Sequence, residues 1–240
     1  MAPRVELRAP PIERDGVACF VSDWLEAEHT RRGWRPRRRQ VVRCGVDVAA
    51  FARPAPAFDP PTRLLFAGRI EPRKGLDVAV RALAVADPAL TLTVAGPLDD
   101  PGYEEAVRRL ASELGVAERV TWLGEVSRTR VRELLAEHDV LVFPTIGEEA
   151  YALGLLEGLA AGVLVVTSAA GGPREYLRHG VNALLHEPGD VAGLVAVLAR
   201  LKEEAGLAQK LLEGARRTAQ DISLDRIVDQ VEGLVKAERA

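Results

Sequence analysis

Two pairs of charged residues stand out in this sequence because each pair lies between an apolar run and an amphipathic segment. Arg69 and Lys74 occur in LLFAGRIEPRKGLD, and Glu149 and Glu157 occur in PTIGEEAYALGLLEGLAAG. Arginine and lysine suit a diphosphate because they donate charged hydrogen bonds to its oxygens. Carboxylates accept hydrogen bonds from vicinal hydroxyls, as they do from the ribose in dinucleotide folds. Together the four residues predict a site for a sugar joined to a diphosphate.

Each pair also has an ordinary interpretation. Cations are common in loops between strands and helices, Glu149 could be an acid favoured near a helix start, and Glu157 could be solvated. Glu157 is flanked by leucines, however, and a carboxylate in such a segment is expected to be paired or functional. Gly154, Gly158 and Gly162 follow at four-residue spacing. An interior glycine costs a helix about 1 kcal/mol relative to alanine, so one helix face is expected to pack its backbone against the sheet or a ligand.

From residue 63 onward, short apolar runs alternate with amphipathic segments. The runs predict strands at Leu64–Ala67, Leu90–Ala95, Val120–Leu123, Val140–Phe143, Val163–Thr167 and Ala183–Leu185. The amphipathic segments predict helices at Leu76–Ala86, Tyr103–Leu114, Arg128–Glu137, Gly154–Ala161, Pro173–Arg178, Val191–Glu204, Leu207–Ala219 and Leu224–Lys236. Unbroken apolar strands between helices are typical of a parallel sheet covered on both faces. The predicted fold class is therefore α/β, a doubly wound parallel sheet with C-terminal helices.

This fold would bring the two charged pairs to the same edge of the sheet. Ligands of open α/β sheets bind beyond the carboxyl ends of the strands. Arg69 and Lys74 follow the strand predicted at 64–67, and the two glutamates follow the strand predicted at 140–143. Free amides at the helix start between the glutamates could bind a phosphate. Gly171–Gly172 follow a third strand, where the spacing fits a ligand-facing loop and a plain tight turn equally well.

The first 62 residues have a different pattern. Strands are predicted at Val17–Val21 and Val41–Cys44, and a helix is predicted from the N-cap Ser22 to about Arg32. The stretch 51–62 is proline-rich and is predicted to be a stiff linker. The predicted organisation is an appendage at 1–50, a linker at 51–62 and a complete α/β domain with C-terminal helices at 63–240.

The composition limits which cell compartment and which classes of partner are expected. The net charge of −3 gives no overall attraction to nucleic acid or membrane. No apolar run approaches the roughly 18 residues that span a bilayer, and the N-terminus has no hydrophobic signal region. Cys19 and Cys44 lie in apolar runs and are predicted to be buried, reduced thiols, which fits a cytoplasmic protein.

The basic run Arg31–Arg43 is interpreted as a solvated or interdomain surface. Peripheral contact with the anionic inner membrane surface is the alternative for this run. It holds one aromatic residue and is short, so nucleic acid is not expected as a partner.

Taken in order, the segments resemble the C-terminal donor-binding domain of family 4 retaining glycosyltransferases of the GT-B type (glycosyl transferases group 1). Each segment is weakly specific alone, whereas the ordered set, covering about residues 41–200, is highly specific. The segments are LLFAGRIEPRKGLD, LTVAGP, VTWLGEVS, DVLVFPTIGEEAYALGLLEGLAAG, VVTSAAGGPREYL and HGVNALLHEPGD. CGVDVAAF at 44–51 resembles the family's interdomain crossover. The preceding FVSDWLEAEHTRRGW resembles the last strand and helix of the family's N-terminal acceptor domain, so residues 1–50 would be a remnant of that domain.

The resemblance implies a role for each motif. Arg69 and Lys74 would bind the diphosphate and stabilise charge on the leaving nucleotide, Glu149 would face the hydroxyls of the donor sugar, and Glu157 would hold the ribose. The loop at Glu125–Ser127 would border the nucleobase. The implied catalytic residues are Arg69, Lys74 and Glu149. The implied donor-binding residues are Gly68, Arg69, Lys74, Gly96, Val126, Glu149, Ala152, Leu153, Gly154 and Glu157. The family needs no metal, so no cofactor is expected, and front-face attack assisted by the departing phosphate needs no protein nucleophile.

Two features depart from the family pattern. The family commonly has Glu-Pro-Phe-Gly where this chain has Glu149-Ala150-Tyr151-Ala152. If position 152 requires a positive φ, alanine is strained there by about 1 kcal/mol, and its Cβ could crowd the phosphate and reduce turnover. The second departure is length, because only the end of the N-terminal domain is visible. A natural short gene, a partner chain that supplies the rest and an excised fragment remain open.

The expected function is a retaining hexosyltransferase that uses a nucleotide-diphosphate sugar and an unknown acceptor, or the donor-binding half of such an enzyme. The alternative is a non-catalytic nucleotide-sugar-binding module that needs a partner chain. A nucleotide-sugar hydrolase or epimerase-like enzyme of the same architecture is a third reading. The first 40 residues lack their parent sheet and are expected to expose an apolar face, which a partner chain or a second copy could cover.

Overall fold

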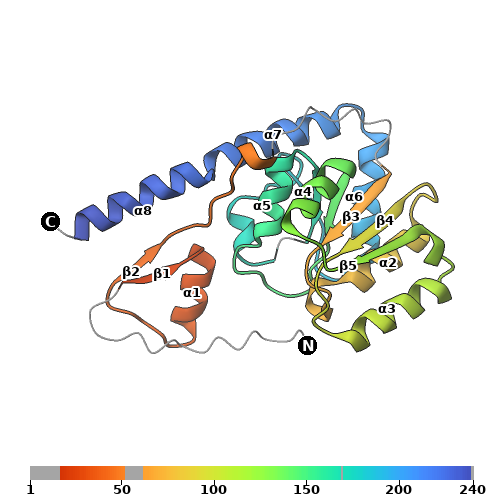
Figure 1. Cartoon of the computed structure of the whole chain (residues 1–240), viewed down its shortest axis with the longest axis horizontal. Helices are drawn as coiled ribbons and strands as arrows, with labels where there is room; N and C mark the ends of the chain where they lie inside the picture. Colours follow the sequence, from red (N-terminus) through yellow and green to blue (C-terminus); the bar gives the residue numbers. More distant parts are fainter. Residues whose placement is uncertain (1–16, 52–61, 169, 239–240) are drawn as a thin grey trace.

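The computed structural model describes residues 17–51, 62–168 and 170–238. Its main element is a six-stranded parallel sheet with the order β5-β4-β3-β6-β7-β8 (Figure 1). The strands are β3 (Arg63–Ala67), β4 (Thr91–Ala95), β5 (Val120–Gly124), β6 (Val140–Phe143), β7 (Leu164–Thr167) and β8 (Leu184–Leu185). The chain adds strands outward from β3 on one side, then returns to β6 and adds strands on the other. The predicted doubly wound parallel sheet is confirmed, with its switch point between β3 and β6.

Helices cover both faces because successive side chains of a strand point to opposite sides of the sheet. In β3, Leu64 and Phe66 belong to one apolar cluster and Leu65 belongs to the other. The helices of the first cluster are α2 (Leu76–Val85), α3 (Pro101–Glu113) and α6 (Val191–Glu203). Those of the second are α4 (Arg128–Glu137) and α5 (Leu153–Ala161). These bounds agree with the predicted helices to within two residues.

Helix α7 (Leu207–Asp221) completes both clusters. Its first half places Leu207 and Leu211 in the first cluster, and its second half places Ala215 and Ala219 in the other. Figure 1 shows α7 crossing the top of the sheet domain between α6 and α8. Both hydrophobic layers therefore depend on one helix.

Residues 17–43, here called the N-terminal lobe, form a separate small unit (Figure 1). Strand β1 (Ala18–Phe20) pairs in parallel with β2 (Arg39–Val41), and helix α1 (Asp23–Arg31) connects them. Ser22 is the N-cap of α1, as predicted, because its Oγ accepts a hydrogen bond from the amide of Leu25 at 3.1 Å.

Three local predictions need correction. The strand predicted at Val41–Cys44 lies at Arg39–Val41, because pairing with β1 defines it rather than its apolar pattern. The helix predicted at Pro173–Arg178 is a short 3-10 turn, η4 (Gly172–Glu175), because Tyr176 leaves the helical region with φ −122°. The predicted burial of both thiols is wrong for Cys19, which is exposed on the outer face of β1, and Cys44 is only half-buried.

The predicted apolar face of the first 40 residues is not present in the described part of that segment, residues 17–40. Phe20, His29 and Trp34 pack on one another there, with ring centroids 5.0–5.5 Å apart, and no large apolar side chain is exposed. Exposed apolar side chains lie instead on α8 (Leu224–Glu238), at Leu224, Val228, Val231 and Val235. Figure 1 shows α8 leaving the sheet domain toward the N-terminal lobe.

The basic run Arg31–Arg43 is largely engaged in ion pairs with neighbouring carboxylates. Arg31 and Arg32 pair with Glu28, Arg39 pairs with Glu26, and Arg43 pairs with Asp23 and Glu175. These pairs favour the solvated or interdomain interpretation of the run. None of the helices formed by the described residues has the length and apolar content that a membrane span requires.

Residues 44–51 connect the N-terminal lobe to the sheet domain and pack against the junction of α7 and α8. The amide of Val46 donates to Ile222 O at 3.1 Å, and the amide of Leu224 donates to Val46 O at 2.8 Å. A short 3-10 turn, η1 (Ala49–Phe51), ends this crossover. The linker predicted at 51–62 lies almost wholly outside the described residues, so the domain boundaries stay a prediction.

Candidate functional site

A cavity of about 780 Å³ opens at the carboxyl ends of β3 and β6, at the switch point of the sheet. Its size suits a small-molecule ligand. The ten residues proposed from the sequence all line it: Gly68, Arg69, Lys74, Gly96, Val126, Glu149, Ala152, Leu153, Gly154 and Glu157. The structure therefore brings together motifs that lie up to 89 positions apart in the chain, since Gly68 and Glu157 share one cavity.

Lys74 is held between a carboxylate and an aromatic ring. It ends the 3-10 turn η2 (Pro72–Lys74), its side chain is buried, and its Nζ lies 2.6 Å from Glu149 Oε1 and 4.8 Å from the centroid of the Phe143 ring. Burial lowers the pKa of Lys74, and the charge of Glu149 opposes that effect. The ion pair with Glu149 favours the charged ammonium and so offsets part of the cost of its burial.

Glu149 is fixed through one of its two carboxylate oxygens. Besides Lys74, Arg73 Nη1 donates to Oε1 at 2.9 Å, and Thr145 Oγ1 lies 3.4 Å from the same atom. Arg73 also binds the backbone of this loop, since its Nη1 donates to Glu148 O at 3.1 Å. All of these contacts fall on Oε1, so Oε2 remains the oxygen with which Glu149 could meet a ligand.

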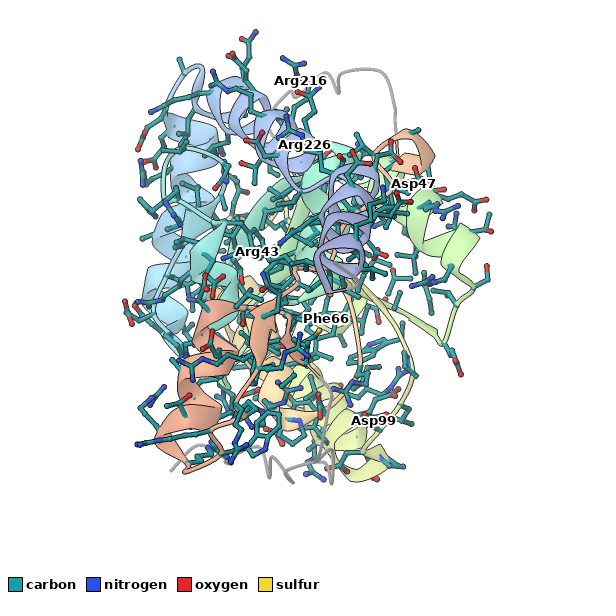
Figure 2. All side chains as sticks on the ribbon, turned by 90° about the vertical axis from the view of Figure 1, so that its left-hand side faces the viewer. Arg43, Asp47, Phe66, Asp99, Arg216 and Arg226 are labelled. Atoms are coloured by element: carbon teal, nitrogen blue, oxygen red, sulfur yellow. The ribbon has the colours of Figure 1, made fainter. Side chains whose placement is uncertain are left out.

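Arg69 has a more exposed position than Lys74. Its guanidinium lies 3.0 Å from Asp99 and 3.3 Å from Glu71, and its side chain is half-exposed. Figure 2 labels Asp99 near the lower edge of the molecule in that view. Exposed ion pairs of this kind are weak, so Arg69 can turn from its carboxylates to a more highly charged ligand.

The segment Glu149–Ala152 is held by its carbonyl groups. Glu149 O accepts from the amide of Gly172 at 2.8 Å, and Ala150 O accepts from Ser22 Oγ at 2.7 Å. Tyr176 Oη donates to Tyr151 O at 2.7 Å and lies 3.2 Å from Ala152 O. Four successive carbonyls are thus bonded to groups outside the cavity.

Anchoring the carbonyls leaves the amides of the same segment available to a ligand. In a planar trans peptide the N–H points opposite to the C=O of the same bond, so the amides of residues 150–153 point away from these anchors. None of the hydrogen bonds among the described residues is donated by a backbone amide of residues 150–154. These residues line the cavity at the N-terminus of α5, where free amides and the helix dipole attract anions.

Ala152 carries the strain that the sequence departure suggested. It is the only non-glycine residue with a positive φ in the described ranges, with φ 56° and ψ 74°, and it is the N-cap of α5. The left-handed conformation turns the chain from the loop into the helix. An alanine there costs about 1 kcal/mol or more relative to an unstrained position.

Glu157 is half-buried in the cavity wall, and no described group forms a hydrogen bond or ion pair with its carboxylate. Burial raises the pKa of Glu157, and the charges of Arg128 and Arg132 oppose that rise. The guanidinium of Arg132 lies over the Phe51 ring at 5.2 Å, which places the crossover against the same wall. An unpaired carboxylate in a cavity is a costly feature that a hydroxylated ligand would relieve.

Sequence reasoning missed Arg73 and the crossover residues Val46, Asp47 and Phe51, which also line or support the cavity. Arg73 is adjacent to Lys74, but nothing in its spacing shows that it reaches a residue 76 positions away. The open question about Gly171–Gly172 is also answered. They do not line the cavity; a Cβ on Gly172 would lie 1.9 Å from Ala150 O, so this pair supports the backbone of the glutamate loop.

No group of three His, Cys, Asp or Glu side chains in residues 17–51, 62–168 and 170–238 is close enough to hold a metal ion. The polar groups assigned to a ligand here are the cations Arg69 and Lys74, the carboxylates Glu149 and Glu157, and a row of amides. Such a set can bind an anion and hydroxyl groups side by side.

Comparison with known proteins supports this description. A family described as "Glycosyl transferases group 1" matches residues 49–218. The D-inositol 3-phosphate glycosyltransferase of Thermomonospora curvata is 35% identical over 209 residues, which cover 82% of this chain and 47% of the relative. The enzyme of the same name from Geodermatophilus obscurus is 37% identical over 244 residues, covering 91% of this chain and 52% of the relative. The chain thus spans about half the length of these curated relatives.

Solved structures show the same fold at low sequence identity. HepE from Anabaena, in complex with UDP and glucose, has a TM-score of 0.84 and 20% identity, covering 92% of this chain and 63% of HepE. The C-terminal domain of a glycosyl transferase group 1 family protein from Francisella tularensis has a TM-score of 0.65 and 20% identity. That match covers 74% of this chain and 97% of the domain, so the sheet domain corresponds to a unit that has been solved by itself.

Proposed function

The chain belongs to the glycosyl transferases group 1 family, and on that premise we propose that its cavity binds a nucleotide-diphosphate sugar as the donor for transfer of a hexose with retention. The observation that carries this proposal is the convergence of all ten predicted residues on one cavity at the switch point. Two cations, a row of free amides and two carboxylates match the diphosphate, the sugar and the ribose of one ligand.

The proposed roles follow from the positions of these groups. The amides of residues 150–154 and Lys74 would bind the diphosphate, and Arg69 would turn to it from Asp99. As the bond to the sugar breaks, negative charge grows on the diphosphate, and these preorganised groups would stabilise it. Glu149 would use its Oε2 for a hydroxyl of the sugar, while its Oε1 stays bound to Lys74 and Arg73. Glu157 would accept hydrogen bonds from the ribose.

The relatives suggest which donor and acceptor to test first. HepE structures contain UDP and UDP-glucose, and the curated relatives are named for D-inositol 3-phosphate. We therefore propose a UDP-hexose as the first donor and an inositol phosphate as the first acceptor. The crossover and the N-terminal lobe, assigned to the end of an acceptor domain, would need further chain to present that acceptor.

The second candidate is a nucleotide-sugar-binding subunit without catalysis of its own. The observation that favours it is the assignment of the cavity residues, since the groups proposed for the cavity bind the donor and none of them is assigned to the acceptor. In that case a partner chain or a second copy would supply the acceptor side.

Calorimetric titration with UDP, GDP and ADP tests the proposed ligand. The site variants are Glu157→Gln and Lys74→Met, which keep side-chain size. Glu213→Gln is the control, because the Glu213 side chain is exposed on the outer face of α7 and lies outside the cavity. We expect UDP to bind and each site variant to weaken it on the order of tenfold or more, the scale of a lost hydrogen bond to a charged group. Absence of nucleotide binding, or equal binding by the site variants, would reject the proposal.

Turnover separates the two candidates. Release of UDP from UDP-glucose is measured by mass spectrometry with D-inositol 3-phosphate as acceptor, with and without a cell lysate that could supply a partner. Acceptor-dependent release without the lysate supports the transferase, and release only with the lysate supports a subunit that needs a partner chain. Binding without any release supports the non-catalytic subunit.

A further inference from the structure

The hydrogen bond between Ser22 and Ala150 joins the N-terminal lobe to the loop that carries Glu149. Ser22 is fully buried, although it lies 128 positions before its partner. Its hydroxyl donates to Ala150 O at 2.7 Å and accepts from the amide of Leu25 at 3.1 Å. One side chain therefore caps α1 and holds a carbonyl of the cavity wall.

A second contact fixes the same helix end on the sheet domain. The amide of Trp24 donates to Glu175 Oε1 at 2.8 Å, and Arg43 donates to Glu175 Oε2 at 3.1 Å. The carboxylate of Glu175 thus lies at the N-terminus of α1, where the helix dipole favours it. Arg43, labelled in Figure 2, lies where the N-terminal lobe meets the sheet domain.

The carbonyl that Ser22 holds controls the direction of an amide. Ala150 O and the amide of Tyr151 belong to one planar peptide, so fixing the carbonyl toward Ser22 fixes that N–H on the opposite side, with the cavity-lining residues. The next carbonyl, Tyr151 O, accepts from Tyr176 Oη, and the turn ends at the strained Ala152, whose carbonyl accepts from the amide of Leu155. A strained conformation persists only where its surroundings hold it. Among the described residues, Ser22 is the one anchor of this segment that comes from the N-terminal lobe.

We propose that Ser22 is a positioning residue for the diphosphate site, through which docking of the N-terminal lobe preorganises the amides of residues 150–154. This inference rests on the proposed function, because the ligand of those amides is taken to be a diphosphate. It assigns to the lobe an effect on donor binding that is separate from any contact with the acceptor.

The test compares UDP with uridine in Ser22→Ala, Ser22→Thr and Asp190→Ala. Asp190 caps α6 in the same way, by accepting from the amide of Gly193 at 2.9 Å, and it does not line the cavity. We expect Ser22→Ala to weaken UDP on the order of tenfold and to leave uridine unchanged, because only the diphosphate meets the amides. Ser22→Thr keeps the hydroxyl and should bind UDP within about twofold of wild type, as should Asp190→Ala. Equal UDP affinity in Ser22→Ala and wild type, or equal losses for UDP and uridine, would overturn the inference while the proposed function stands.

Hydrogen exchange without nucleotide gives an independent readout. The amides of Glu149 and Gly172 are bonded within the loop, to Ala170 O and Glu149 O. They should exchange faster in Ser22→Ala and remain unchanged in Asp190→Ala. If wild type binds no nucleotide, the proposed function fails, and this measurement alone decides whether Ser22 positions the loop. Unchanged exchange would then reject the inference.

If Ser22→Ala does not fold, Glu175→Gln replaces it. This variant keeps Ser22 and an acceptor for Trp24 but removes the charge that binds Arg43. It should weaken UDP by a smaller factor than tenfold and again leave uridine unchanged. Equal binding of UDP by Glu175→Gln and wild type would contradict the role given to lobe docking.

Discussion

Glu157 shows how a single residue can serve a ligand at a cost to the fold. It is half-buried, and no described side chain pairs with its carboxylate, so burial raises its pKa. A carboxyl group with a raised pKa contributes stability below its unfolded value, near 4.5, and loses that contribution as pH rises through the folded value. At neutral pH the charged form is therefore destabilising.

The first prediction concerns Glu157→Gln. The variant should be more stable than wild type at pH 7.5, by up to about 1 kcal/mol, because an amide has no charge to bury. The gain should disappear near pH 4, where wild-type Glu157 is protonated in both states. Urea denaturation at the two pH values measures this. A gain of the same size at both would mean that ionisation is not its cause.

The second prediction concerns the strained Ala152. Ala152→Gly should raise the free energy of unfolding by about 0.5–1 kcal/mol, because glycine adopts φ 56° without steric cost. The matched control is Ala160→Gly in the right-handed interior of α5, which should lose about 1 kcal/mol. Thermal denaturation compares them. If both substitutions destabilise, residue 152 is not strained.

The glycines of α5 show how one helix meets the sheet. A Cβ on Gly158 would lie 2.6 Å from Leu141 Cδ2 in β6 and 3.3 Å from Val165 Cγ2 in β7. The expected packing of a backbone face is therefore found at Gly158. Gly162 instead ends the helix in the left-handed conformation, and Gly154 lines the cavity.

The third prediction uses this contact. Gly158→Ala should destabilise the protein by about 1–3 kcal/mol, because the extra methyl group forces α5 away from β6 and β7. Gly233→Ala is the matched control, since Gly233 lies inside α8 with no heavy atom within 4 Å of an added Cβ. It should gain up to about 1 kcal/mol from helix propensity. Chemical denaturation measures whether each substitution raises or lowers the free energy of unfolding. A stabilised Gly158→Ala would show that the sheet can make room for the added methyl group.

The elements that sequence reasoning predicted well are those with strong periodicity. The strand predicted from the unbroken apolar run Val140–Phe143 has the same bounds in the structure. Both faces of a central strand are buried, so its whole length is apolar in the sequence. β2 was misplaced because three residues in a two-stranded sheet carry no such pattern. The charged residues of the cavity were singled out by their place beside predicted strands and helices, and the family resemblance implied the rest of the ten. Arg73 and Ser22 were missed, because their partners lie 76 and 128 positions away. The roles of the ten residues stay predictions.

At the scale of the whole molecule, α7 joins the two faces of the sheet. Leu207 and Leu211 pack on one face, and Ala215 and Ala219 pack on the other. Because the same helix packs in both hydrophobic layers, the unfolding of one layer is coupled to the unfolding of the other. The sheet domain is therefore expected to lose both layers together.

The fourth prediction tests this coupling with Leu211→Ala. Removing a buried leucine should cost about 2–5 kcal/mol, and hydrogen exchange should show the same loss at Val107 in α3 and at Leu156 in α5. Val85→Ala is the control, because Val85 is 69% exposed and should change neither site. A loss confined to α3 would show that the two layers open separately.

The contacts that fix the N-terminal lobe also determine the order in which parts of a newly synthesised chain can fold. The lobe leaves the ribosome before the sheet domain, yet Ser22 and Trp24 find their partners 128 and 151 residues later in the chain. Loop closure over such separations is slow, and domains form as units while the chain is still being made. The lobe must wait for β6, α5 and η4 before it can dock. In a newly synthesised chain, the cavity wall that Ser22 anchors is thus expected to reach its final geometry late.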